Sequence, residues 1–93
     1  YPPEVERVFE QHPDVVEAGV VGLPDDTLGE VPVVGLRMAK GATSTPDELL
    51  SWVGERLSTY KVPRRVYFVD DLPRTGTNKL QRDELIERLL DLD

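Results

Sequence analysis

The sequence contains no cysteine and only one histidine. Without cysteine the chain has no disulfide framework, no thiolate nucleophile and no sulfur ligand for a metal. His12 stands directly before Pro13, where a helix is expected to end, and that position is typical of a residue that caps a helix rather than binds a metal. We therefore expect no metal site built from these residues.

Long apolar runs and an excess of basic charge are also missing. No apolar stretch is long enough to span a bilayer, and no basic-then-apolar leader is present. A formal net charge of −7 and a pI of about 4.6 argue against nucleic acid as a partner. We expect a cytoplasmic protein without a transmembrane segment. Its 93 residues, 39% hydrophobic and 31% charged, are sufficient for one small globular domain.

Local patterns predict three helices and three strands. A helix starts at residue 2, with Val5, Val8 and Phe9 spaced as one apolar stripe, and a second starts with the capping box at residues 45–48. The expected strands are residues 15–23, 31–38 and 65–69, and the expected helices are residues 2–11, 46–58 and 83–92. The first two strands, joined by a short polar loop, predict an antiparallel hairpin. The expected fold is a small α+β domain of order α-β-β-α-β-α, whose short, mostly antiparallel sheet is covered by helices.

Several residues have ordinary structural interpretations. Pro32 cannot donate to a β-ladder, so it should lie at a strand start or at a sheet edge. Glu4 and Glu6 suit the positive end of the first helix, and we prefer that interpretation to a catalytic one. Trp52 is suited either to packing at the margin of its helix or to stacking on an adenine, and packing is the more frequent use of such a residue.

The basic side chains are concentrated in one part of the chain. Residues 60–82 hold six of the eleven Lys and Arg residues and only two acidic ones, which gives this segment a net charge of about +4 and the remainder about −11. Such a segment is either a solvated basic face or a site for a phosphate or carboxylate group. Charge alone does not separate the two.

A loop at residues 71–82 carries the candidate chemistry. Its proline, threonines, glycine and asparagine favour turns, and it connects a β-rich run to a helical pattern. Lys79 lies at the far end of the loop, where its flexible cationic side chain is suited to reaching an anion held elsewhere.

Residues 72–82, LPRTGTNKLQR, resemble the terminal lysine motif of the adenylate-forming enzymes, the superfamily of acyl-CoA synthetases, adenylation domains and luciferases. Asn78 departs from that motif, because it stands where the family usually has glycine; asparagine also tolerates left-handed dihedral angles, so the turn is expected to survive. Residues 1–6, YPPEVE, and 60–63, YKVP, resemble two further motifs of the family, in the same order. The resemblance extends from Tyr1 to about Leu90.

The resemblance implies that residues 1–93 are the single C-terminal lid domain of a larger two-domain enzyme, and that the hinge and the N-terminal domain, which binds ATP and the acid, are absent. It implies that Lys79 is the catalytic residue of adenylation, with Thr75 beside it on the ATP and acyl-adenylate side, while Thr77 and Gly76 shape the loop. Lys61 and Val62 are implied to face CoA, whereas Leu28 replaces a basic residue that some relatives use near CoA.

The implied function is that of an acyl-CoA synthetase, in which a carboxylic acid and ATP give acyl-AMP and pyrophosphate, and CoA then gives acyl-CoA and AMP. The resemblance implies that this fragment is not active alone. ATP and Mg²⁺ would be bound mainly by the absent domain, and CoA is the co-substrate. The fatty- or aryl-acyl branch fits the motifs best. The alternatives are an adenylation domain that loads a carrier protein and a free-standing interaction module whose basic loop binds an acidic partner.

Overall fold

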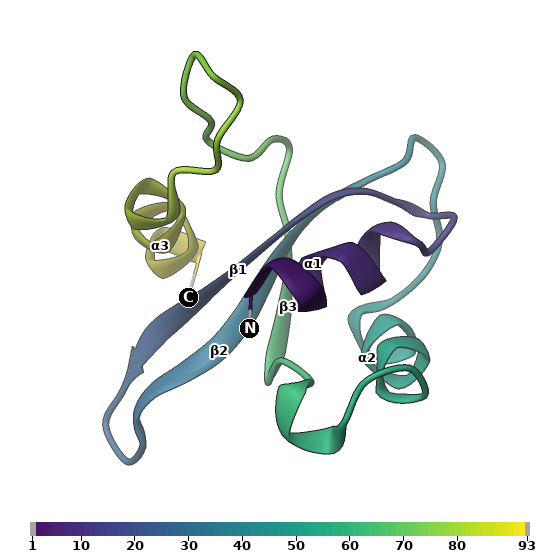
Figure 1. Cartoon of the computed structure of the whole chain (residues 1–93), viewed down its shortest axis with the longest axis horizontal. Helices are drawn as coiled ribbons and strands as arrows, with labels where there is room; N and C mark the ends of the chain where they lie inside the picture. The colour runs from purple at the N-terminus through teal and green to yellow at the C-terminus, as the bar shows by residue number, and fades with distance from the viewer. Residues whose placement is uncertain (1, 93) are drawn as a thin grey trace.

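The computed structural model describes residues 2–92, which form a sheet with helices on both faces (Figure 1). The sheet order is β1-β2-β3. The elements are α1 (Pro2–Glu10), β1 (Val15–Asp25), β2 (Gly29–Met38), α2 (Pro46–Gly54), the 3-10 turn η1 (Thr59–Lys61), β3 (Arg65–Phe68) and α3 (Arg82–Leu92). The predicted order and fold class are therefore confirmed.

The sheet is mixed rather than nearly all antiparallel. β1 and β2 form a long antiparallel hairpin, whereas β3 pairs with β2 in parallel, Val33 opposite Arg65 and Leu36 opposite Phe68. The reason is the connection: the chain leaves the end of β2, passes through α2 and η1, and returns to the starting side before β3 begins. A parallel strand is what such a helical crossover produces.

The β1–β2 hairpin is longer than predicted. Residues 24–30 were expected to be loop, but the strands continue to Asp25 and resume at Gly29. The carboxylate of Asp25 accepts the N–H groups of Thr27 and Leu28, at 3.1 and 2.8 Å, and Gly29 adopts a φ of 81°. The hydrogen bonds of the Asp25 side chain and the positive φ of Gly29 thus close a tight turn where a longer loop was expected.

Pro32 lies in the central strand, not at an edge. It is nevertheless just outside the part of β2 that pairs with β3, and its carbonyl accepts the N–H of Arg64 at 2.8 Å. The second helix also differs from prediction, since it ends at Gly54 and not near Ser58. Its predicted capping box at Thr45 and Glu48 is present.

Each face of the sheet carries its own hydrophobic cluster. One lies under α1 and α2 and includes Phe9, Leu36 and Leu49; the other lies under α3 and includes Val33 and Leu85. The alternation of side chains along β1 and β2 supplies both clusters, which explains why these strands have long apolar runs. The second cluster is the platform from which residues 72–82 extend.

Candidate functional site: the lysine hairpin

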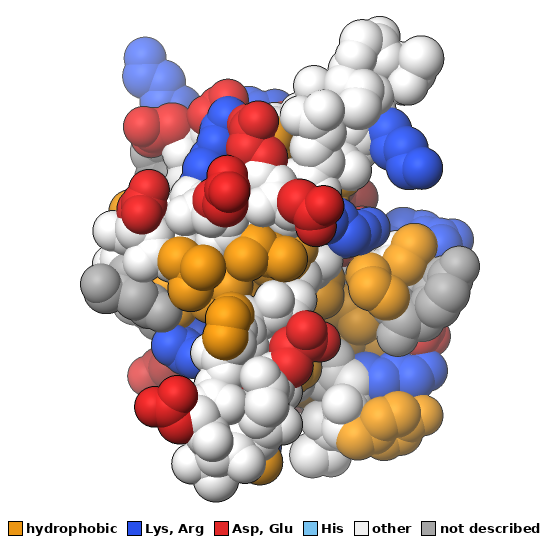
Figure 2. Space-filling model, turned by 90° about the vertical axis from the view of Figure 1, so that its left-hand side faces the viewer, with side chains coloured by type: hydrophobic (Ala, Val, Ile, Leu, Met, Phe, Trp, Pro, Cys, Tyr) orange, Lys and Arg blue, Asp and Glu red, His pale blue; other side chains and the backbone are white. Residues whose placement is uncertain are grey.

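Residues 73–81 form a small hairpin that projects from the domain between β3 and α3. Arg74 and Leu80 form an isolated antiparallel bridge. Thr75 N–H donates to the carbonyl of Lys79 at 2.8 Å, and Gln81 N–H donates to that of Pro73 at 2.9 Å. The hairpin stands clear of the sheet at the top of Figure 1 and forms the projection at the top of Figure 2. We call residues 73–81 the lysine hairpin.

The tip of the lysine hairpin is shaped by local hydrogen bonds. Asn78 N–H donates to the carbonyl of Thr75 at 2.8 Å, and Asn78 then adopts a φ of 65°. A turn followed by a left-handed residue is a common geometry of three-residue hairpin loops. The hydroxyl oxygen of Thr75 contacts that of Thr77 at 2.9 Å and accepts Lys79 N–H at 3.2 Å. The prediction that asparagine takes the left-handed position is confirmed.

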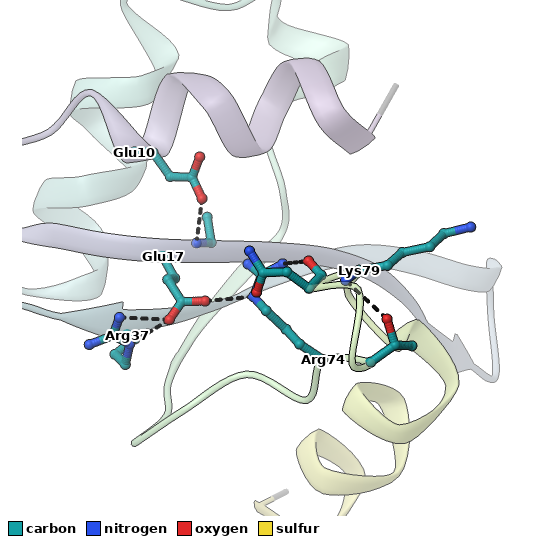
Figure 3. A network of polar contacts seen from close by, with 8 residues as sticks. Glu10, Glu17, Arg37, Arg74 and Lys79 are labelled. Atoms are coloured by element: carbon teal, nitrogen blue, oxygen red, sulfur yellow. Dashed lines mark hydrogen bonds and ion pairs between the residues drawn. The ribbon is translucent and has the colours of Figure 1, made fainter.

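Lys79 is exposed at the tip, and within residues 2–92 no acidic side chain forms an ion pair with it. Figure 3 shows its side chain extending away from the neighbouring polar network. A lysine held at its backbone and free at its ammonium is a cation available to an incoming anion.

The two arginines that flank Lys79 are, in contrast, both paired within the domain. Arg74 Nε donates to Glu17 at 2.9 Å, and Arg82 Nη1 donates to Glu6 at 2.6 Å and to the carbonyl of Val20 at 2.6 Å. The basic character of this segment is therefore not that of a uniform solvated face, because these two arginines stabilise the fold while the lysine faces outward.

Glu17 binds two guanidinium groups at once (Figure 3). One carboxylate oxygen accepts from Arg74, and the other accepts from Arg37 Nε and Nη2, both at 2.7 Å. Burial raises the pKa of the Glu17 carboxyl, but the hydrogen bonds from Arg74 and Arg37 outweigh it, so the pKa lies below its ordinary value. Since the folded state favours the ionised form, this stabilisation is present above the ordinary pKa of glutamate and is lost as the pH falls through the lowered value.

The turn η1 lies at the opposite end of the domain from the lysine hairpin (Figure 1); Lys61 is its last residue and Val62 follows it. Both are half-buried. Lys61 Nζ donates a hydrogen bond to Glu4 of α1 at 2.9 Å and forms an ion pair with it, so Lys61 already has an acidic partner within the domain. That hydrogen bond lowers the pKa of Glu4 and raises the pKa of Lys61.

Glu4 and Glu6 of α1 also do more than complement a helix dipole. Glu4 binds Lys61, while Glu6 binds Arg82 and accepts the N–H of Val20 at 2.8 Å. These contacts join α1 to segments far away in sequence. Sequence reasoning missed them, since nothing in a local pattern shows which distant cation a helical glutamate will meet.

An open groove is lined in part by Val62. Its volume is about 750 Å³, and it runs between the β1–β2 turn and the segment after η1. Tyr60 and Leu28 on its walls are 81% and 56% exposed, an arrangement suited to covering by another surface.

The lone tryptophan and histidine have structural roles. Trp52 packs against the first hydrophobic cluster, its ring 4.8 Å from that of His12, and the Arg56 guanidinium lies 3.6 Å from its centre. His12 Nδ1 accepts the N–H of Asp14 at 3.0 Å and so stabilises the turn that follows α1, rather than capping the helix end itself as the sequence had suggested. Trp52 is therefore a packing residue, which agrees with the preferred interpretation.

The described residues lack both a metal-binding cluster and a membrane-spanning helix. Residues 2–92 contain no cluster of three or more His, Cys, Asp or Glu side chains arranged to hold a metal ion. None of their helices combines the length and the apolar character that crossing a membrane requires.

Comparison with known proteins identifies the class of domain. Residues 4–79 match the AMP-binding enzyme C-terminal domain, and the chain belongs to this family. It is 51% identical over 85 residues to the 2-succinylbenzoate–CoA ligase of Geobacillus kaustophilus, a match that covers 91% of this chain and 17% of that protein.

Two solved structures share the fold. ATP-bound MatB from Rhodopseudomonas palustris superposes with a TM-score of 0.89 at 36% identity, over 99% of this chain and 18% of that one. A double mutant of the o-succinylbenzoate CoA synthetase MenE from Bacillus subtilis, bound to the product analogue OSB-NCoA, gives 0.82 at 43% identity, over 95% and 18%. The chain thus spans about a sixth of the length of these relatives, consistent with one domain of a larger enzyme.

Proposed function

We propose that this chain is the mobile C-terminal domain of an AMP-forming acyl-CoA synthetase, and that Lys79 is its catalytic residue. The reaction joins a carboxylate to ATP, giving acyl-AMP and pyrophosphate, and then transfers the acyl group to CoA with release of AMP. The observation that carries the proposal is the state of Lys79: its backbone is fixed in a rigid tip while its ammonium has no acidic partner within residues 2–92.

Lys79 suits the first half-reaction for an electrostatic reason. A carboxylate must approach the α-phosphate of ATP, so two anions come together and negative charge develops on the phosphoryl oxygens. A cation positioned between them offsets the repulsion and stabilises the transition state. Thr75, whose hydroxyl accepts Lys79 N–H, belongs to the same nucleotide-facing tip.

The remaining machinery belongs to an N-terminal domain, which would bind ATP and the acid. Mg²⁺, if used, would neutralise phosphate charge, but the described residues offer no cluster of ligands for it, so its ligands must come from that domain or from the nucleotide. We do not expect adenylation by residues 1–93 alone.

CoA is proposed to approach the other end of the domain, where Val62 lines the open groove and Lys61 precedes it in η1. Because the lysine hairpin and this face lie at opposite ends, one orientation of the domain cannot place both in the same active site (Figure 1). A rotation between the half-reactions would present Lys79 first and the CoA-side face second.

The acid is proposed to be aromatic, and 2-succinylbenzoate is the first compound to test, because it is the substrate in the name of the relative that is 51% identical. A carrier-protein thiol in place of CoA is the second candidate function. It is supported only by the wider superfamily, which includes such adenylation domains. Thioester formation by the full-length enzyme with CoA and with a pantetheine-bearing carrier protein separates the two.

The test is deletion of residues 1–93 from the full-length polypeptide. We expect the remaining protein to bind ATP, while acid-dependent ATP–pyrophosphate exchange falls by about 10³-fold or more, since the cation is lost. Thioester formation should also be lost. Unchanged exchange after deletion would contradict the proposal and favour an interaction module.

Replacing Asn78 by glycine should leave the adenylation rate unchanged or raise it, since glycine adopts the observed φ of 65° without steric cost. Asn78→Val is the matched contrast, because a β-branched residue there costs about 1–2 kcal/mol. We expect this variant to slow pyrophosphate exchange. A large fall with Asn78→Gly would show that the asparagine side chain has a positive role.

A further inference from the structure

The lysine hairpin is fastened at its first strand by Arg74. The guanidinium of Arg74 donates through Nε to Glu17 at 2.9 Å and through Nη1 to the carbonyl of Asn78 at 3.2 Å. It therefore connects a carboxylate on β1 with the backbone of the residue that precedes Lys79. A charge-assisted contact of this kind is stronger and more directional than a neutral hydrogen bond.

Glu17 is itself held in place. Its second oxygen accepts from Arg37, the residue directly opposite it on β2, and the Glu17 side chain is only 23% exposed. Its position is thus set by the paired strands of the sheet, not by the flexible tip. The sheet fixes the position of Glu17, and Arg74 links the lysine hairpin to Glu17.

A second attachment follows Lys79. Arg82, at the start of α3, donates to Glu6 and to the carbonyl of Val20 on the outer edge of β1. This contact fixes the point where the lysine hairpin returns to the domain. Without the two attachments, the tip would be restrained chiefly by the hydrogen bonds within the hairpin itself.

We propose that Glu17 is a positioning residue for Lys79 and acts through Arg74. This inference rests on the proposed function, since it requires that Lys79 enter an active site. The physical reason is geometric: an exposed hairpin tip that shifts by about 1 Å can lose about 10²-fold in rate without any change in the reacting groups. Glu17 keeps the tip aimed while Lys79 reaches into the other domain.

The experiment is a double-mutant cycle in the full-length enzyme, with Glu17→Gln, Arg74→Gln and both together. We expect each single change to lower the single-turnover adenylation rate by about 10-fold to 100-fold. The double variant should be no slower than the slower single one, because residues acting through each other are not additive. The KM for ATP and the rate of thioester formation from supplied acyl-AMP should change less than about twofold. The proposal would be overturned if the rate loss of the double variant equalled the product of the two single losses, or if both half-reactions were slowed equally.

Arg56→Gln is the matched control. It removes an exposed arginine whose ion pair is with Glu55, away from Glu17 and Arg74, so adenylation should remain within about twofold of the parent rate. Arg74→Lys is a second variant that keeps the positive charge if Arg74→Gln fails to fold. A lysine cannot donate at once to Glu17 and to the Asn78 carbonyl with the same fork geometry, so we expect slower adenylation at unchanged melting temperature.

Lys79→Ala separates this inference from the proposed function. If Glu17 acts only through the lysine, Glu17→Gln should cause no further loss of adenylation in the Lys79→Ala background; a further loss would overturn the inference. If Lys79→Ala itself has no effect, the proposed function fails. If Lys79→Ala abolishes adenylation and Glu17→Gln is neutral, only the positioning role fails.

Discussion

Replacing Lys79 by alanine in the full-length enzyme is expected to lower acid-dependent ATP–pyrophosphate exchange by about 10³-fold. The reason is Coulombic: a unit charge pair at about 4 Å contributes about 4 kcal/mol at an effective dielectric of about 20. About 4 kcal/mol of lost transition-state stabilisation corresponds to a rate change of about 10³-fold. The fold should be unaffected, because the side chain is exposed and forms no ion pair with the described residues.

The two half-reactions should respond differently to this change. Thioester formation from supplied acyl-AMP should continue at the parent rate, because the lysine hairpin and η1, where we propose that CoA approaches, lie at opposite ends of the domain (Figure 1). Lys40→Ala is the control, since this lysine is also exposed but lies in the turn after β2. It should alter neither half-reaction. An equal loss of both half-reactions in Lys79→Ala would contradict the assigned role.

The local features of the site were predictable from sequence because they depend on short-range chemistry. Asn78 could be placed in a left-handed turn, since asparagine and glycine are the residues that tolerate it, and the structure has that geometry. The capping box at residues 45–48 and the apolar stripe of α1 were found for the same reason. The role proposed for Lys79 came from motif resemblance, because spacing alone does not point to it.

What sequence reasoning missed depends on contacts between distant segments. Glu17 lies 57 residues from Arg74, and Glu6 lies 76 from Arg82, so no local pattern links them. The parallel direction of β3 likewise follows from the path of the crossover and not from the composition of the strand. The sequence nevertheless contained one usable signal: Glu17 is an acidic residue within an apolar strand, and most acidic partners for the strongly basic segment at residues 60–82 had to lie elsewhere in the chain.

The packing role of two glycines in the sheet was also not predicted, although a glycine inside a strand often marks a close approach by another element. Gly19 and Gly35 are directly opposite each other on β1 and β2, and both are buried. A Cβ at Gly19 would lie 2.9 Å from Leu85 and 3.0 Å from Leu80, while one at Gly35 would lie 3.4 Å from Leu85. The glycines make room for α3 and for the residue that follows Lys79.

Gly19→Ala is therefore expected to destabilise the domain by about 1–3 kcal/mol, the usual range for overpacking a core. Each kcal/mol lowers the melting temperature of a domain this size by about 4–8 °C. Leu85 is fully buried and cannot swing aside, so α3 or Leu80 must shift, and Leu80 is bonded to Lys79. We thus expect Gly19→Ala to slow adenylation even at temperatures below the melting temperature of the variant, where the domain is folded.

Gly22→Ala is the matched control on the same strand. Its new Cβ would lie even closer to another atom, 2.3 Å from the carboxyl carbon of Glu30, but Glu30 is exposed and free to change rotamer. The expected cost is within about 0.5 kcal/mol. Equal melting temperatures for the two variants would mean that α3 yields easily to the added methyl group. In that case the packing of α3 against Gly19 would not determine the position of Leu80, the residue that follows Lys79 in the lysine hairpin.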